Sequence, residues 1–84
     1  MSLLFTEDAD LQLRQLEADP TQGRLLDAVS EALELLERDP GDDRCRLVRY
    51  TNGIWRMNVP GTDLMILWRA LDVEPLVTYV GLQL

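Results

Sequence analysis

The dipeptide Asn52-Gly53 is the feature that most restricts what this chain can fold into. Both residue types accept the positive φ angles that a two-residue type I′ hairpin turn requires. The segments on either side, 45–51 and 54–59, contain β-branched and aromatic residues that favour strands. The sequence therefore predicts a β-hairpin over residues 45–59, and a two-residue turn would set the pairing of its two strands.

That turn assigns the hairpin side chains to two faces, because successive side chains in a strand point to opposite sides. Arg49 is then expected opposite Arg56. The predicted apolar face holds Val48, Tyr50, Trp55, Met57 and Val59, and the predicted cationic face holds Arg49, Thr51, Arg56 and Asn58. Two facing arginines repel each other, so they are expected to meet an anion, to bridge to a nearby carboxylate or to remain solvated.

Two helices are expected before the hairpin. Thr6 is placed to cap the first helix, which runs to Asp19-Pro20 with a stripe formed by Leu11, Leu13 and Leu16 and, as a lighter contact, Ala9. The second helix is expected from residue 22 or 23 to about 39, where Pro40-Gly41 stops it. Its apolar residues recur with the helical period, which predicts packing by one side: Leu25, Val29, Ala32, Leu33 and Leu36.

Two further strands are expected after the hairpin, at 64–71 and 76–82, with turns at 60–63 and 72–75. The segment 64–68 is apolar on both sides, which suits a central strand partly covered on each face. Either a partner covers the second face, or its leucine and methionine side chains simply pad a shallow surface. With a weak first strand near Leu3–Phe5, the order is β-α-α-β-β-β-β. Residues 1–84 are thus expected to form one α+β domain, an antiparallel sheet with a two-helix hairpin on one face.

Composition excludes several function classes. The chain has no histidine and one cysteine, Cys45, which we interpret as a small apolar residue, so neither a metal site nor a cofactor is expected. It contains no glycine-rich phosphate loop and no Gly-x-Ser-x-Gly motif. No segment has the length and apolar character of a signal peptide or a membrane span, so a cytoplasmic location without membrane contact is expected.

Charge is distributed unevenly along the chain. The net charge is −7, yet residues 1–43 carry 12 of the 15 acidic residues and residues 44–84 carry a net charge of +2. The overall acidity argues against broad nucleic-acid binding but leaves room for a local cationic face. The expected binding surface comprises Arg46, Arg49, Arg56, Asn58 and Arg69, and Arg56 and Arg49 are the candidates for any catalytic role.

Several segments resemble the RelE/ParE superfamily of bacterial toxins from type II toxin-antitoxin systems. The likeness runs through Leu4-Phe5-Thr6, the helix end at residues 32–40 and Gly53-Ile54-Trp55-Arg56-Met57, which is similar to the central strand of the family. Residues 63–72 and 77–81 are similar to its last two strands. The resemblance implies a compact α+β fold and a cognate antitoxin wrapped around the helices and the sheet edge.

Two activities are implied by branches of that family: ribosome-dependent cleavage of messenger RNA, and inhibition of DNA gyrase in the ParE branch. In the nuclease branch, Arg56 matches the first basic position, Asn58 replaces a second and Met65 stands where an arginine is expected. Only residues 82–84 follow the final Val-Gly.

We therefore expect a toxin-type module that acts mainly by binding an antitoxin, or a second copy of itself, with nuclease activity lost or weak. The alternatives are a working mRNA endonuclease that relies on Arg49 and Arg56, and a gyrase inhibitor that needs no catalytic residues.

Overall fold

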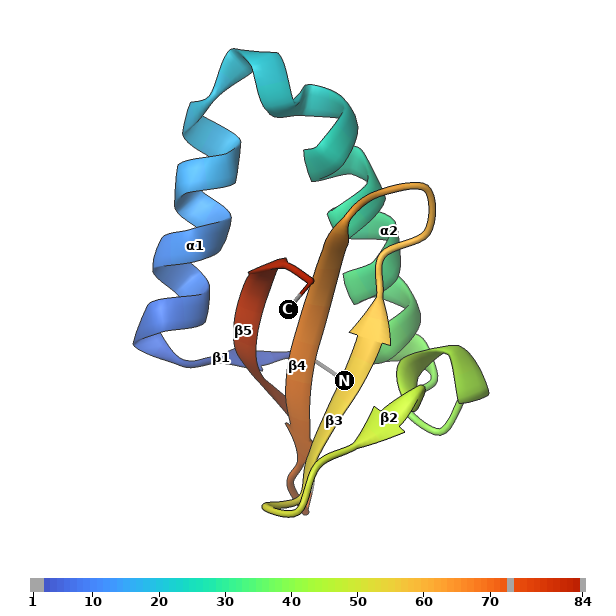
Figure 1. Ribbon diagram of the computed structural model, residues 1–84. Helices are drawn as coiled ribbons and strands as arrows, with labels where there is room; N and C mark the ends of the chain where they lie inside the picture. Colours follow the sequence, from blue (N-terminus) through green and yellow to red (C-terminus); the bar gives the residue numbers. More distant parts are fainter. Residues whose placement is uncertain (1–2, 73, 84) are drawn as a thin grey trace.

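The computed structural model describes residues 3–72 and 74–83. It is a small α+β domain in which two helices pack against a five-stranded sheet (Figure 1). In chain order, its elements are β1 Leu4–Phe5, α1 Glu7–Ala18, η1 Pro20–Gln22, α2 Gly23–Arg38, η2 Asp43–Cys45, β2 Val48–Arg49, β3 Ile54–Asn58, β4 Leu64–Ala70 and β5 Pro75–Leu82. This is the predicted order with two short 3-10 turns, η1 and η2, added. Val73, predicted in the turn before the last strand, lies outside the described residues.

The sheet has the strand order β1-β5-β4-β3-β2. Strands β2 to β5 form the predicted antiparallel meander, with β4 in the predicted central position. The sheet as a whole is mixed, however, because β1 runs parallel to β5 and pairs Leu4 with Leu76. The expectation of a purely antiparallel sheet is wrong at this edge. A local sequence pattern indicates a strand, but not which partner it meets 72 residues further along the chain.

Both helices begin and end close to the predicted residues. The Thr6 hydroxyl accepts a hydrogen bond from the Ala9 N–H at 3.2 Å, which caps α1. The predicted stripe of α1 is wrong in one respect: Ala9 is fully buried, whereas Leu11 is 56% exposed. In α2, the predicted stripe supplies the buried residues Val29, Ala32, Leu33 and Leu36.

The core lies between the helices and one face of the sheet. Strands β3 and β4 present alternate residues to it, and the largest fully buried side chain is Trp68. The Trp68 indole N–H donates a buried hydrogen bond of 2.8 Å to the carbonyl of Cys45. This bond ties η2 to the central strand, so the segment between α2 and the hairpin is held against the core.

Met65 is fully buried, although its side chain lies on the sheet face that no described helix covers. In register, it lies between Asn58 and Gly81. The Tyr79 ring lies so close to Gly81 that a Cβ there would be 2.6 Å from the Tyr79 hydroxyl. The Gln83 side chain donates to the main chain of β4 at 3.2 Å. Met65 is therefore covered within the chain itself, so its burial does not require the partner that was considered for this face.

Candidate functional site

The hairpin is present, but its turn and register differ from the prediction. Arg49 pairs with Trp55 and Val48 pairs with Arg56, a shift of one residue. The loop is a three-residue one, because the Tyr50 N–H donates to the Ile54 carbonyl at 2.8 Å. Among the hairpin residues, only Gly53 has a positive φ, +81°. This is the arrangement of a type I turn followed by a glycine bulge, whereas a type I′ turn needs two positive φ angles.

The one-residue shift separates the two arginines that were expected to face each other. Arg49 shares the face of Trp55, and Arg56, the next residue after Trp55, points to the opposite face. The predicted cationic face therefore does not exist as one surface. β2 is also shorter than expected, because Cys45 lies in η2 and not at the start of a strand.

Arg56, Asn58 and Arg69 lie on the sheet face that no described helix covers. The Arg56 guanidinium is held by two amide oxygens: its Nε donates to Asn58 Oδ1 at 3.0 Å and one Nη to Gln83 Oε1 at 3.3 Å. Arg69 lies opposite Ile54, one diagonal step from Arg56. Neither arginine forms an ion pair with a described carboxylate, so no acidic side chain among the described residues compensates their charge.

Arg46 and Arg49 gather instead around the tryptophans on the helix side. The guanidinium carbon of Arg46 lies 5.1 Å from the ring centroid of Trp55 and 5.5 Å from that of Trp68. The guanidinium carbon of Arg49 lies 5.5 Å from the Trp55 centroid. These are cation–π distances, and Arg46 also donates from Nε to the Pro40 carbonyl at 2.9 Å. The predicted binding surface is therefore divided between two faces of the sheet.

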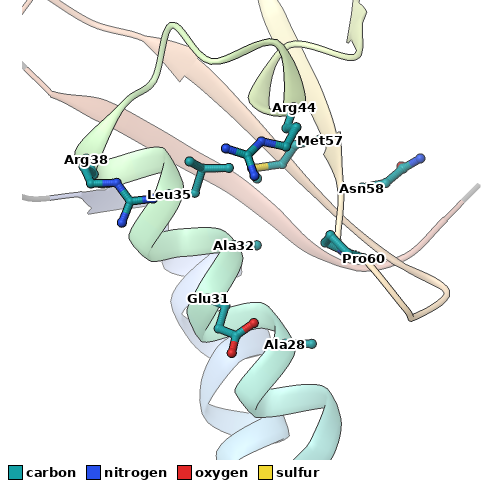
Figure 2. Close-up of a pocket in the computed structure, with 9 residues that line it drawn as sticks. All are labelled: Ala28, Glu31, Ala32, Leu35, Arg38, Arg44, Met57, Asn58 and Pro60. Atoms are coloured by element: carbon teal, nitrogen blue, oxygen red, sulfur yellow. The ribbon is translucent and has the colours of Figure 1, made fainter.

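A groove of about 200 Å³ lies between α2 and the C-terminal end of β3 (Figure 2). Its apolar lining comes from Ala28, Ala32 and Leu35 on the helix and from Met57 and Pro60 on the sheet side. Its charged lining comes from Glu31, Arg38 and Arg44. In Figure 2, Met57 and Arg44 face Leu35 across the groove. The groove thus combines an apolar floor with charges of both signs.

The backbone beside this groove has a hydrogen-bonding edge with no backbone partner among the described residues. The Val59 N–H donates to the Leu64 carbonyl at 3.0 Å, so by strand alternation the main-chain polar groups of Asn58 point away from β4. β2, the next strand on that side, pairs no further along β3 than Arg56. Asn58 therefore presents its N–H and C=O toward the groove, while its side chain points away from α2 (Figure 2).

Sequence reasoning missed the helix side of this groove. The signal was present, since Ala28, Ala32 and Leu35 recur at helical spacing in a stripe next to the core stripe. Small residues in this second stripe leave space where larger ones would have filled the gap against Met57.

A second hollow, of about 490 Å³ and more open, lies between α1 and the end of β5. Its lining includes Gln12, Gln15 and Gln22, and Asp19 is its one charged residue. The Gln12 amide oxygen is already engaged, since it accepts from the Val80 N–H at 2.8 Å. This hollow therefore offers little to orient a charged ligand.

The described residues contain no cluster of three or more histidine, cysteine or acidic side chains that could hold a metal ion. No helix in the described part of the chain is both long and apolar enough to cross a bilayer.

Cys45 is buried, as the interpretation of it as a small apolar residue implies. Burial raises the pKa of its thiol from 9.0 to about 11, and the nearby Asp42 and Asp39 add to the shift. We expect alkylation by iodoacetamide near neutral pH to be roughly 100-fold or more slower in the native protein than in denaturant, since the thiolate is the nucleophile.

Cys45 also makes stability depend on pH at the alkaline end. Its thiol is neutral in both states below pH 9, and the unfolded chain ionises first as the pH rises toward about 11. Unfolding is therefore expected to become easier over that interval, and a Cys45→Ser variant should lose this pH dependence. In the iodoacetamide experiment, alkylation of Cys45 as fast in the native state as in the unfolded state would contradict the burial of this thiol.

The fold and groove together define the class: a small α+β domain with a two-helix layer on a mixed five-stranded sheet and a groove along one sheet edge. Comparison with known proteins finds no match among family models, curated proteins or solved structures.

Proposed function

We propose that this chain is a divergent toxin-type module of the RelE/ParE class whose main biochemical property is binding a partner protein, an antitoxin. The observation that carries the proposal is the groove between α2 and β3. At about 200 Å³, it is smaller than the ~300–1,000 Å³ typical of small-molecule sites. It has room for one or two side chains of a docked segment.

The chemistry of the groove suits a polypeptide better than a small ligand. The apolar side chains of Leu35 and Met57 can bury an apolar anchor, and the open main-chain groups of Asn58 can pair with a backbone. Arg38 and Arg44 line the end of the groove nearest η2, and Glu31 lines it closer to the N-terminus of α2. Arg44 is partly neutralised by Asp42, which accepts from it at 2.9 and 3.0 Å.

The endonuclease alternative receives no support from the geometry. It relied on Arg49 and Arg56 acting together, and these side chains lie on opposite faces of β3 and its neighbour. Arg56 is left with Asn58 and Gln83, whose amides neither gain nor lose protons in the accessible pH range. If Arg56 held a phosphate on this face, neither Asn58 nor Gln83 could act as a general acid or base toward it.

The test is to induce the chain in a bacterial host, alone and together with the product of the adjacent reading frame. We expect no growth arrest with the chain alone. Arrest accompanied by mRNA cleavage at ribosomes, and relieved by Arg56→Ala, would establish the endonuclease instead. Arrest accompanied by gyrase-cleaved DNA would establish the gyrase inhibitor.

A further inference from the structure

The Asn52-Gly53 pair lies at the tip of the hairpin, in the loop between β2 and β3. Asn52 is exposed, and the space beside Gly53 is open, since a Cβ placed on Gly53 would have no atom beyond its chain neighbours within 4 Å. β2, on one side of the loop, is paired with β3 over two described residues. A loop at the end of so small an element opens at little cost in free energy. Water therefore reaches this pair, and its main chain can change conformation locally.

The two reactive groups of this pair are held by surface hydrogen bonds. The Asn52 Oδ1 accepts from the Ile54 N–H at 3.4 Å, which is longer than the roughly 2.7–3.2 Å of an ordinary N–H···O bond. The Gly53 N–H donates to the Tyr50 carbonyl at 3.2 Å. Each bond can be exchanged for a hydrogen bond to water at a small net cost.

We propose that Asn52 is a site of spontaneous deamidation, in which the main-chain nitrogen of Gly53 is the nucleophile. After hydroxide removes the proton of the Gly53 amide, the nitrogen attacks the side-chain carbonyl carbon of Asn52. A bond forms between Gly53 N and Asn52 Cγ, the Cγ–Nδ2 bond breaks, and ammonia leaves with a proton taken from water. Asparagine is among the thermolabile residue types, and a following glycine allows the close approach of main chain that this step needs.

Water then opens the cyclic imide at either of its two carbonyl carbons. Attack on Cγ breaks the newly formed bond and gives aspartate. Attack on the main-chain carbonyl carbon breaks the original peptide bond and gives isoaspartate, in which the main chain runs through the side-chain carbon atoms and is one atom longer. Both products add one negative charge to a chain whose net charge is −7.

The isoaspartyl product does not fit the loop. The three-residue loop depends on the φ of +81° at Gly53 and on the hydrogen bond from Gly53 to Tyr50, and both belong to a main chain of normal length. The bond from the Tyr50 N–H to the Ile54 carbonyl closes the hairpin directly beside this loop. We therefore expect the modification to weaken the pairing of β2 with β3.

Asn58 is the other asparagine of the chain and serves as an internal control. Its Oδ1 accepts from Arg56 Nε at 3.0 Å. The nitrogen that would attack Asn58 belongs to Val59, which is 1% exposed and whose N–H donates to the Leu64 carbonyl at 3.0 Å. Attack would require this part of the sheet to open, so Asn58 should stay intact while Asn52 reacts.

This inference does not rest on the proposed function, because neither Asn52 nor Gly53 lines the groove. The purified chain is incubated near neutral pH and at mildly alkaline pH, and peptide mass mapping with fragmentation locates the amide-to-acid conversion and separates isoaspartate from aspartate. We expect both products at Asn52, and a rate that rises with pH because the attacking nitrogen must lose its proton. The native chain should react more slowly than the denatured chain by no more than about tenfold, since only surface hydrogen bonds have to open.

Asn52→Gln is the matched variant, because it keeps a neutral amide but moves the amide carbon one bond further from the Gly53 nitrogen. It should remain unconverted over the same period. If Asn52 stays intact in the native chain while the denatured chain is converted, or if Asn58 is converted equally fast, the inference is overturned. Formation of aspartate without isoaspartate would overturn the assignment of Gly53 as the nucleophile.

Hydrogen exchange of the isolated isoaspartyl form tests the effect on the hairpin. The Tyr50 amide should exchange faster than in the unmodified chain, and the Val59 amide, which is bonded within the sheet, should exchange at its original rate. An unchanged Tyr50 amide would overturn the predicted weakening of the β2 pairing.

Discussion

Replacing Trp68 with alanine is expected to lower the free energy of unfolding by about 3–5 kcal/mol, the usual range for deleting a buried tryptophan side chain. Trp68 is 1% exposed and lies in the central strand. An 84-residue domain has a total stability of roughly 4–13 kcal/mol, so this one change removes a large share of it. Thermal denaturation should show a melting temperature lower by roughly 15–30 °C.

Part of that loss comes from the hydrogen bond between the Trp68 indole and the Cys45 carbonyl. Trp68→Phe keeps most of the ring but leaves this buried carbonyl without its partner, at a cost of about 1–3 kcal/mol. The matched control is Leu11→Ala in α1, which removes an exposed apolar side chain and should change stability by less than ~0.5 kcal/mol. Equal effects of Trp68→Ala and Leu11→Ala would contradict the described core.

Replacing Ala28 with arginine is expected to weaken binding of the proposed antitoxin partner by roughly 100-fold or more, which corresponds to about 2.7 kcal/mol. Ala28 lines the groove and is half-buried. A long charged side chain at this position occupies the groove volume and places charge on its apolar floor. The measurement is a titration of each variant with the purified product of the adjacent reading frame.

Ser30→Arg is the matched control for Ala28→Arg. Ser30 is exposed on the same helix, and two residues along an α-helix point in clearly different directions. It receives the same new side chain outside the groove, so it should leave binding unchanged. If Ala28→Arg lowers thermal stability, Ala28→Leu fills the groove without adding charge and keeps the comparison valid. Wild-type affinity in both groove variants would show that the groove is not the binding site.

The elements of this fold could largely be predicted from the sequence because their signals are local. The Thr6 cap, the helical period of α2 and the Pro40-Gly41 stop each lie within or beside the segment they define. The parallel pairing of β1 with β5 could not be predicted in the same way. It depends on a contact between Leu4 and Leu76, and neither local pattern specifies that contact.

The hairpin register shows how one residue changes a predicted site. Asn52-Gly53 suits a type I′ turn, but the same glycine can also end a three-residue loop, and only its backbone angles distinguish the two. Because strand side chains alternate, the one-residue difference moved Arg49 away from Arg56 and beside Trp55. The residue types of the predicted binding surface follow from the sequence, but the division of these residues between two faces required the structure.

The groove depended on tertiary packing and was missed for that reason. Ala28, Ala32 and Leu35 form a helical stripe, yet only the position of α2 relative to Met57 shows that the stripe lines an open space. Ala32 belongs both to this stripe and to the buried core. The sequence pattern assigned it to the core, and it therefore gave no sign of a groove.

The central claim is that this chain binds a partner protein, and light scattering during size-exclusion chromatography tests it most directly. The chain is co-expressed with the product of the adjacent reading frame and purified through a tag on that product. We predict that the two proteins elute together with the summed mass of a defined complex, and that Ala28→Arg abolishes co-elution while Ser30→Arg does not. A chain that elutes separately, at the mass of its own monomer, would contradict the claim.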